Sequence, residues 1–430
     1  MIIVDSALRR REQEGNPVRV AMVGAGAIGR GIALQVATAV PGMEIVAISN
    51  RRIEQAEHAY REAGATQTVQ VEDIEALNSA IEEGTPAITD DPSLLCAAPA
   101  VDAIWEVTGA VEFGATVALD AIAHGKHLVT MNAEMQGTVG PVLKHRADEA
   151  GVVITDSDGD QPGVMMNLWR FVRGIGVRPV LLGNMKGLHD PYRNPTTQEA
   201  FARQNGLTPH MAASFADGTK MSFEMALVAN ATGLRAGRRG LYGPSCSNVK
   251  DAADLFPLDQ MLEFGLVDYV VGAEPAPGVF CLGFHEDEEQ KRWLRLYKLG
   301  EGPLYTFYTP YHLCHLEAPT TVARAVLFGD AAVAPDAGHV VDVVAVAKHV
   351  LEPGVVIDGI GFYSTYGVCE NAEIARSERL LPMGLAAGCT VTRRVRKDEV
   401  LTYDDVEVPP GRVVDELRAE QAQLFQGAAG

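Results

Sequence analysis

Three glycines near the N-terminus, Gly24, Gly26 and Gly29, have the spacing G-x-G-x-x-G. An apolar segment precedes them at 18–23, and a segment with helical spacing follows at 32–40. Such glycines allow a tight turn, close approach of a pyrophosphate and close packing of helix on strand, and the helix N-terminus offers free N–H groups to phosphates. A glycine-rich turn in another kind of α/β sheet is the alternative. We predict a dinucleotide site formed by Gly24, Ala25, Gly26, Ala27, Ile28 and Gly29.

The residues after the second expected strand, 44–48, select the dinucleotide. An acidic side chain about 20 residues past the glycines would bind the ribose 2′-hydroxyl of NAD. Here the sequence is Ser49-Asn50-Arg51-Arg52. A guanidinium can hold a 2′-phosphate through paired, charge-assisted hydrogen bonds, which a carboxylate would repel. We therefore predict NADP(H), bound by Asn50, Arg51 and Arg52. The alternative is that both arginines are solvated on the following helix.

A lysine and a glutamate could perform acid–base chemistry further along the chain. Lys220 and Glu224 are four residues apart in a segment of helical pattern, 217–230, for which Asp217 is the expected cap. The flanking methionines predict a largely buried helix. From spacing alone the pair either faces a cleft or is a solvated surface pair.

Polar side chains follow several expected strands. Ligands of doubly wound sheets lie at the carboxyl ends of the strands. From that rule we predict that the rim of a cleft is formed by the residues at or just after these strand ends, which are Glu106, Thr108, Gly109, Asn132, Glu134, Asp156, Asp158 and Asp160. The run 156–160 lacks the bidentate acid of a calcium loop. In an expected strand at 312–317, His312 and Cys314 would face away from His315 and Glu317, which argues against zinc.

The elements that must position these residues change in pattern along the chain. Residues 17–160 alternate strand and helix, which predicts an α/β fold with a Rossmann-type doubly wound parallel sheet, preceded by a helical arm. We expect this domain to span 1–160, and an α+β catalytic and oligomerisation domain to span 161–335. Segments 346–356 and 391–401 align as an internal repeat at an offset of 45 residues (391 − 346), so we expect a small β domain over 336–430.

Composition excludes several classes of partner. A chain of 430 residues is too long for one core. Its formal charge, 36 − 56 = −20, argues against nucleic acid and anionic membranes and leaves a small-molecule substrate. No segment approaches the roughly 18 apolar residues of a membrane span. The six cysteines are scattered without C-x-x-C, as expected of reduced thiols in a cytoplasmic protein.

Several segments together resemble the homoserine dehydrogenase superfamily, and within it the 1-deoxy-D-xylulose-5-phosphate reductoisomerase-like family. The resemblance is carried by 19–26, 106–109, 126–132, 217–220, 224–226, 230–234 and 310–317. The tail, through 381–389 and 401–407, resembles a SAF domain. The chain departs from homoserine dehydrogenase at Ala133, where that enzyme has a lysine.

The resemblance implies NADPH-dependent reduction of a small, phosphorylated ketose or polyol, with 1-deoxy-D-xylulose 5-phosphate to 2-C-methyl-D-erythritol 4-phosphate, a step of isoprenoid biosynthesis, as the specific expectation. Three alternatives stay open: oxidation or oxidoisomerisation of a free or branched sugar acid, a homoserine dehydrogenase-like reaction, and a non-catalytic NADP- or sugar-binding sensor. We expect a homo-oligomer, a dimer or a tetramer.

The same resemblance suggests roles for individual residues. Lys186 and Lys220 would stabilise a developing alkoxide or bind a phosphate. Asp160 and Glu224 would transfer protons or bind a metal. A divalent cation, Mg²⁺ or Mn²⁺, would lie at Asp158 and Asp160. The predicted cofactor site is completed by Thr108, Gly109 and Asn132.

Overall fold

A computed structural model describes residues 2–425. The chain divides into two compact units, each described here by itself. The N-terminal unit comprises Met1–Asp160 and Leu313–Ala334, and the C-terminal unit comprises Gln161–His312 and Pro335–Gly430. Among residues 2–425, no helix is both long and apolar enough to cross a membrane.

The N-terminal unit contains a seven-stranded sheet in the order β3-β4-β2-β1-β5-β6-β7, and every pair of neighbours is parallel. Its strands are short apolar runs, typical of a sheet covered on both faces. This confirms the predicted Rossmann-type sheet. The strands are β1 (Val18–Val23), β2 (Met43–Ser49), β3 (Val69–Gln70), β4 (Ala87–Thr89), β5 (Ala103–Glu106), β6 (His127–Thr130) and β7 (Ile154–Asp156).

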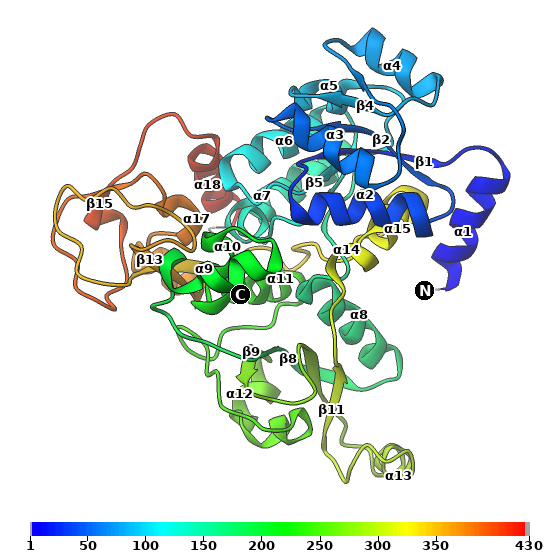
Figure 1. The fold of residues 1–430 in the computed structure, drawn as a ribbon. Helices are drawn as coiled ribbons and strands as arrows, with labels where there is room; N and C mark the ends of the chain where they lie inside the picture. The colour runs from blue at the N-terminus through cyan, green and yellow to red at the C-terminus, as the bar shows by residue number, and fades with distance from the viewer. Residues whose placement is uncertain (1, 426–430) are drawn as a thin grey trace. The chain divides into compact units, whose positions relative to one another are not determined.

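Helices connect these strands and add to the core (Figure 1). They are α1 (Ile2–Gln13), α2 (Ala27–Ala39), α3 (Ile53–Glu62), α4 (Ile74–Glu82), α5 (Pro92–Ala97), α6 (Val111–Ala123), α7 (Ala133–Ala150), α14 (Cys314–Glu317) and α15 (Pro319–Phe328). The last two come from a distant part of the sequence. Val322 and Ala325 of α15 belong to the same buried cluster as Val20 and Trp105 of the sheet. Residues 313–334, expected in the second domain, therefore pack with the first.

The C-terminal unit begins with α8 (Gln161–Gly174) and a four-stranded sheet in the order β11-β10-β8-β9. Strands β8 (Arg178–Lys186) and β9 (Leu266–Val271) are parallel, whereas β10 (Gly278–Phe284) is antiparallel to β8 and to β11 (Leu304–Thr309). Its further helices are α9 (Pro195–Asn205), α10 (Pro209–Ala216), α11 (Thr219–Thr232), η1 (Val249–Asp254), α12 (Leu258–Glu263) and α13 (Glu288–Leu296).

Residues 335–430 join this unit through α11. They contain β12 (Val341–Ala347), β13 (Thr365–Asn371), α16 (Ala372–Ser377), α17 (Met383–Ala386), β14 (Thr390–Val391), η2 (Tyr403–Asp405), β15 (Val406–Glu407) and α18 (Val413–Leu424). Helix α11 contacts β8 and β9 of the sheet and also β12 and β13. Asn230 of α11 accepts hydrogen bonds from the N–H groups of Val340 and Val341 at 2.8 and 2.9 Å. Because of these contacts, the residues expected to form a separate third domain belong to the same compact unit as most of the expected second domain.

The two segments of the predicted repeat pair with each other. Isolated antiparallel bridges join Val346 to Val400, Leu351 to Val395, and Val356 to Thr390. Leu351 and Val395 exchange both backbone hydrogen bonds, at 2.9 and 3.0 Å. Because the two copies of the repeat pair with each other in antiparallel orientation, an approximate two-fold axis relates one copy to the other. The offset in sequence alone could not reveal this pairing.

Candidate functional site

The carboxyl ends of five neighbouring strands form one row in the N-terminal unit. In the pairing register the row reads Ser49 of β2, Val23 of β1, Glu106 of β5, Thr130 of β6 and Asp156 of β7. The polar residues nominated from the sequence lie on or directly after these strand ends. The parallel sheet thus brings them to one edge, where doubly wound folds bind ligands.

The glycine turn follows β1 at this edge, and each glycine has a distinct steric role. Gly24 has φ +108°, and a Cβ there would lie 3.1 Å from the Val107 carbonyl. A Cβ at Gly29 would lie 2.6 Å from the Gly24 oxygen, so α2 can approach the turn only without a side chain. Gly26 is the N-cap of α2, makes no side-chain cap, and has open space within 4 Å of its would-be Cβ. The N-terminus of α2 therefore fits a pyrophosphate.

Asn50 connects the glycine turn to the end of β2. Its Oδ1 accepts a hydrogen bond from the Ala25 N–H at 3.1 Å, and its Nδ2 donates to the Arg52 carbonyl at 2.8 Å. Arg51 and Arg52 have exposed side chains. These residues fit a nicotinamide dinucleotide, which when bound supplies or accepts a hydride. The preference for a 2′-phosphate stays a prediction.

A buried glutamate organises the adjoining strand ends. Glu106 accepts hydrogen bonds from the Thr108 N–H at 2.8 Å, from the Thr108 hydroxyl, and from the Thr130 hydroxyl at 2.9 Å. Burial raises the pKa of Glu106, although these hydrogen bonds oppose the shift. Asn132 caps α7 by accepting from the Met135 N–H at 3.0 Å. Thr108 and Asn132 thus shape this edge, and their contact with a cofactor remains a prediction.

The expected metal ligands have different surroundings. Asp158 Oδ2 lies 2.9 Å from Arg324 Nη1 and accepts from the Thr320 hydroxyl at 3.1 Å. Both charged side chains are almost fully buried. An arginine at that distance supplies the charge that a cation would otherwise provide, so the contacts of Asp158 do not favour a metal there. Asp160 is 6% exposed, and its predicted role stays open.

The segment that includes Cys314 and Glu317 has a different local structure from the one expected. The sequence pattern suggested a strand over 312–317, whereas Cys314–Glu317 form the short helix α14. The Cys314 N–H donates to the Gly159 carbonyl at 2.7 Å. The alternation of faces used against a zinc site therefore does not apply, because α14 has no strand periodicity.

In the C-terminal unit, the helix predicted to begin at Asp217 begins two residues later. Gly218, with φ +86°, is the N-cap of α11. Asp217 nevertheless contributes, because its Oδ1 accepts a hydrogen bond from the Thr219 N–H at 2.8 Å. The other oxygen, Oδ2, lies 2.8 Å from Lys348 Nζ.

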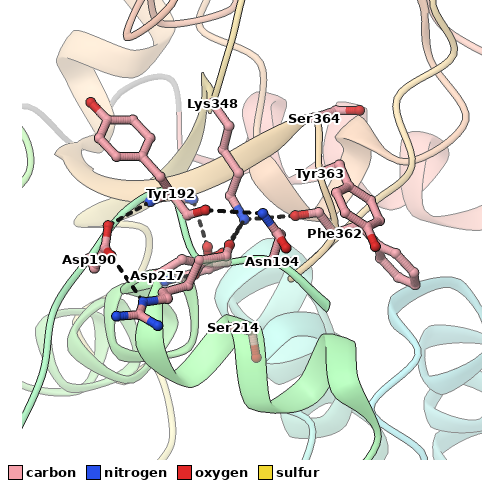
Figure 2. Close-up of polar contacts among 12 residues, drawn as sticks. Asp190, Tyr192, Asn194, Ser214, Asp217, Lys348, Phe362, Tyr363 and Ser364 are labelled. Atoms are coloured by element: carbon pink, nitrogen blue, oxygen red, sulfur yellow. Dashed lines mark hydrogen bonds and ion pairs between the residues drawn. The ribbon is translucent and has the colours of Figure 1, made fainter. Parts of the chain in front are cut away.

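Lys348 is a buried connector at the start of α11 (Figure 2). Its ammonium donates to Asp217, to the Arg193 carbonyl at 2.6 Å and to the Phe362 carbonyl at 2.7 Å. Three acceptors use all three ammonium protons. This lysine, which follows β12, therefore holds together the 187–194 loop, the beginning of α11 and the 358–364 loop.

Of the two predicted catalytic residues of α11, Glu224 contacts the sheet. Glu224 is 1% exposed and accepts a hydrogen bond from Asn184 Nδ2 at 2.7 Å. Lys220, one turn earlier on the same face, is half-buried. A solvated surface pair is therefore excluded. Lys186, at the end of β8, lies two residues after Asn184 and shares its face of the strand.

A histidine–tyrosine pair, missed in the sequence, lies beside these residues. His189 Nδ1 lies 2.9 Å from the Tyr269 hydroxyl. A Cβ at Gly218 would lie 2.5 Å from His189 Nε2, so the imidazole packs directly on the start of α11. Burial lowers the pKa of His189 and raises that of Tyr269 to about 12, which keeps both groups neutral near pH 7. Tyr269 is paired in register with Asn184.

Lysine, buried glutamate and a neutral histidine–tyrosine pair on one helix–sheet surface can stabilise an oxyanion and transfer protons. The available sequence signal for His189 is its place in the polar stretch 186–195, because a long loop inside a compact domain is usually functional or disordered. Tyr269 and Asn184 lie inside apolar strands and gave no such signal.

Two family profiles match the chain. Residues 24–151 match the NAD-binding domain of homoserine dehydrogenase, and residues 159–318 match the catalytic domain described as oxidoreductase DRL. Neither profile alone covers half of the chain. The first match ends at residue 151 and the second begins at residue 159, close to Asp160, where the first segment of the N-terminal unit ends.

Solved structures resemble this chain only distantly. A probable dehydrogenase from Thermotoga maritima is 15% identical with a TM-score of 0.43, covering 75% of this chain and 92% of that one. Myo-inositol 2-dehydrogenase from Lactobacillus plantarum is 12% identical with a TM-score of 0.41, covering 73% and 91%. No curated protein matches the sequence significantly.

The glycine turn, the parallel sheet and the two profile matches lead to one conclusion. The chain is an NAD(P)-dependent oxidoreductase, in which residues 24–151 are similar to the NAD-binding domain of homoserine dehydrogenase and residues 159–318 are similar to the catalytic domain of oxidoreductase DRL.

Proposed function

We propose that this oxidoreductase uses NADPH to convert a small phosphorylated ketose into a polyol phosphate, with 1-deoxy-D-xylulose 5-phosphate and 2-C-methyl-D-erythritol 4-phosphate as the specific pair. The observation that carries the proposal is the buried Glu224 one helical turn from Lys220, on the helix face that contacts Asn184. Such a pair suits a substrate on which a hydroxyl loses a proton while a carbonyl oxygen gains negative charge.

In this proposal each residue acts on a stated atom. Glu224 accepts the proton of one substrate hydroxyl. The carbon skeleton then rearranges, starting from the alkoxide that this leaves. Lys220 stabilises the oxygen of the carbonyl that becomes an alcohol, and the Tyr269 hydroxyl, backed by His189, donates a proton to it. Lys186 binds the phosphate. A carbon–carbon bond then moves from the carbon of the deprotonated hydroxyl to the carbonyl carbon, which leaves an aldehyde at the former hydroxyl. NADPH, when bound, would supply a hydride to that aldehyde, Glu224 would return its proton to the aldehyde oxygen, and water would restore the Tyr269 hydroxyl, so atoms and charge balance.

The choice of NADPH rests on Arg51 and Arg52, which follow β2 with exposed guanidinium groups. A 2′-phosphate is the anion that such a pair binds best at this position of a dinucleotide fold.

A divalent cation remains a proposal for Asp160 alone. It predicts that turnover rises with Mg²⁺ or Mn²⁺ and falls with a chelator, and that Asp160→Asn removes this dependence. We also propose a homo-oligomer, a dimer or tetramer, which light scattering of the purified protein would test. A cytoplasmic location accords with the six cysteines, none of which forms a disulfide within the described part of the chain.

The deciding experiment compares two substrate classes with one protein preparation. NADPH oxidation is measured with 1-deoxy-D-xylulose 5-phosphate, and NADP⁺ reduction is measured with tetronates and branched sugar acids. Turnover with the ketose phosphate, identified as the polyol phosphate by mass spectrometry, supports the proposal. Turnover only with the acids would replace it by the sugar-acid alternative, while the assignment as an oxidoreductase would stand.

A further inference from the structure

A pocket lies in the C-terminal unit, within residues 339–422. It is open, with a volume of about 730 Å³. Apolar side chains form part of its wall, namely Ala375, Leu380, Leu385, Ala419 and Ala422. Polar lining residues come from the end of α16, from η2 and from α18. None of its lining residues belongs to the helix–sheet surface that carries Lys220 and Glu224.

A buried histidine whose ring nitrogens are poorly satisfied lines this pocket. The side chain of His339 is 2% exposed. Neither of its ring nitrogens makes a hydrogen bond to any residue between 2 and 425, although Nε2 lies 3.5 Å from Asp342 Oδ2. Burial lowers the pKa of His339, so the ring is neutral. Because Nε2 approaches Asp342 only at 3.5 Å and Nδ1 has no partner among residues 2–425, the buried ring keeps hydrogen-bonding capacity that a bound group can use.

An arginine on the same wall has an unused donor as well. Nη1 of Arg376 is buried and has no hydrogen-bond acceptor in the part of the chain that the structure describes. Arg376 is close enough to His339 for its charge to lower the pKa of the imidazole. Arg376 and His339 therefore bring unused hydrogen-bonding capacity to one pocket wall.

The other charged groups of the pocket are matched. Arg418 contacts Asp342, and Asp415 lies 2.7 Å from Arg412. Arg379 pairs with Asp404 at 3.1 Å across exposed surface. No carboxylate among the described residues pairs with Arg376. The pocket thus keeps an uncompensated positive charge in a chain whose net charge is −20.

We infer that this pocket binds the phosphate or carboxylate group of a small metabolite, with Arg376 and His339 as its hydrogen-bond donors. A guanidinium fork matches both oxyanions. The volume lies in the range of small-molecule sites and exceeds a bare anion, so the apolar wall is left to contact the rest of the metabolite. The inference does not rest on the reaction proposed above.

The test measures anion binding to the full-length protein saturated with NADPH, which occupies the nucleotide site. Inorganic phosphate, glycerol 3-phosphate and malonate are titrated by calorimetry and by thermal shift. The variants are Arg376→Gln and His339→Gln. Arg394→Ala is the matched control, because this arginine is exposed and pairs with Glu352 at 3.2 Å away from the pocket. Lys220→Ala reports on anions bound at the substrate residues.

We expect at least one probe to bind wild-type, Arg394→Ala and Lys220→Ala proteins with equal affinity. Arg376→Gln should weaken binding at least tenfold and His339→Gln several-fold, with unchanged melting temperature in the absence of anion. Tight binding of the two phosphates alone or of malonate alone identifies which oxyanion the site takes. The inference is overturned if none of the probes binds, if Arg376→Gln binds like wild type, or if Lys220→Ala abolishes binding. A variant with a lowered melting temperature is replaced by Arg376→Lys, for which intermediate affinity is expected.

Discussion

Replacing Lys348 by methionine tests whether the buried pair with Asp217 holds the start of α11 in place. Methionine keeps the length of the side chain and removes the charge. Asp217 is 0% exposed and would retain the Thr219 N–H at 2.8 Å as its hydrogen-bond donor. Removing one partner of a buried ion pair costs about 3–5 kcal/mol, because the other charge is left buried. We expect a loss of that size in the free energy of unfolding, measured by urea titration.

The loss should depend on pH in a defined direction. Burial raises the pKa of Asp217 in the folded protein, and Lys348 opposes that shift. When the pKa of a carboxyl is higher in the folded than in the unfolded protein, the group stabilises the folded state at pH values below its unfolded pKa. That contribution to the free energy of unfolding is lost as the pH rises through the folded pKa. Without Lys348 the pKa of Asp217 rises further. The variant should therefore lose more stability at pH 8 than at pH 5, by about 1.4 kcal/mol for each unit of that additional rise.

Two further variants separate this explanation from loss of packing. Adding Asp217→Asn to Lys348→Met removes the stranded carboxylate, so the double variant should be more stable than the sum of the single effects predicts and should lose the pH dependence. Lys250→Met, at an exposed lysine, should change stability by less than about 0.5 kcal/mol. A loss below about 1 kcal/mol for Lys348→Met, or an equal loss at both pH values, would refute the reasoning.

Three other predictions concern the cofactor and the catalytic residues. Arg51→Asp with Arg52→Ala should weaken NADPH binding by about ten- to a hundredfold and NADH binding much less, measured by fluorescence titration; equal losses would place the arginines away from the 2′-phosphate. Lys220→Ala and Glu224→Gln should each lower turnover by about two to four powers of ten while NADPH affinity stays unchanged, and full activity in both would remove them from the site. Gly26→Ala should leave the melting temperature unchanged, because no atom lies within 4 Å of the added Cβ, but should weaken NADPH binding; unchanged affinity would contradict a pyrophosphate at this turn.

Local features of the N-terminal unit were predictable because the residues that form them are neighbours in the sequence or stand at the ends of successive strands. The glycine spacing determines a turn made by neighbouring residues, and parallel strands place their carboxyl ends at one edge. Glu106 and Asp156 could therefore be assigned to the same rim from strand positions alone. The partner of Asp158 could not, because Arg324 lies 166 residues further along the chain, on a helix of the N-terminal unit that follows the first segment of the C-terminal unit.

The same limit applies to the start of α11. Asp217 was identified as a cap from its position before a helical segment, yet its main partner, Lys348, is 131 residues away. Gly218 took the cap position because a left-handed residue is needed there, and a side chain would collide with His189. The separate third domain was expected for a similar reason: the repeat was visible, but the attachment of β12 to α11 through Asn230 was not.

The burial of α11 bears directly on the role of its charged residues. A helix that contacts a sheet on one side and a β pair on another would be most stable with apolar or neutral side chains. Glutamine could make the same kind of hydrogen bond to Asn184 as Glu224 does, without a carboxylate at 1% exposure. The hydrogen bond to Asn184 alone therefore does not require an acid at this position. Proton transfer does, since a carboxylate can accept and return a proton and an amide cannot.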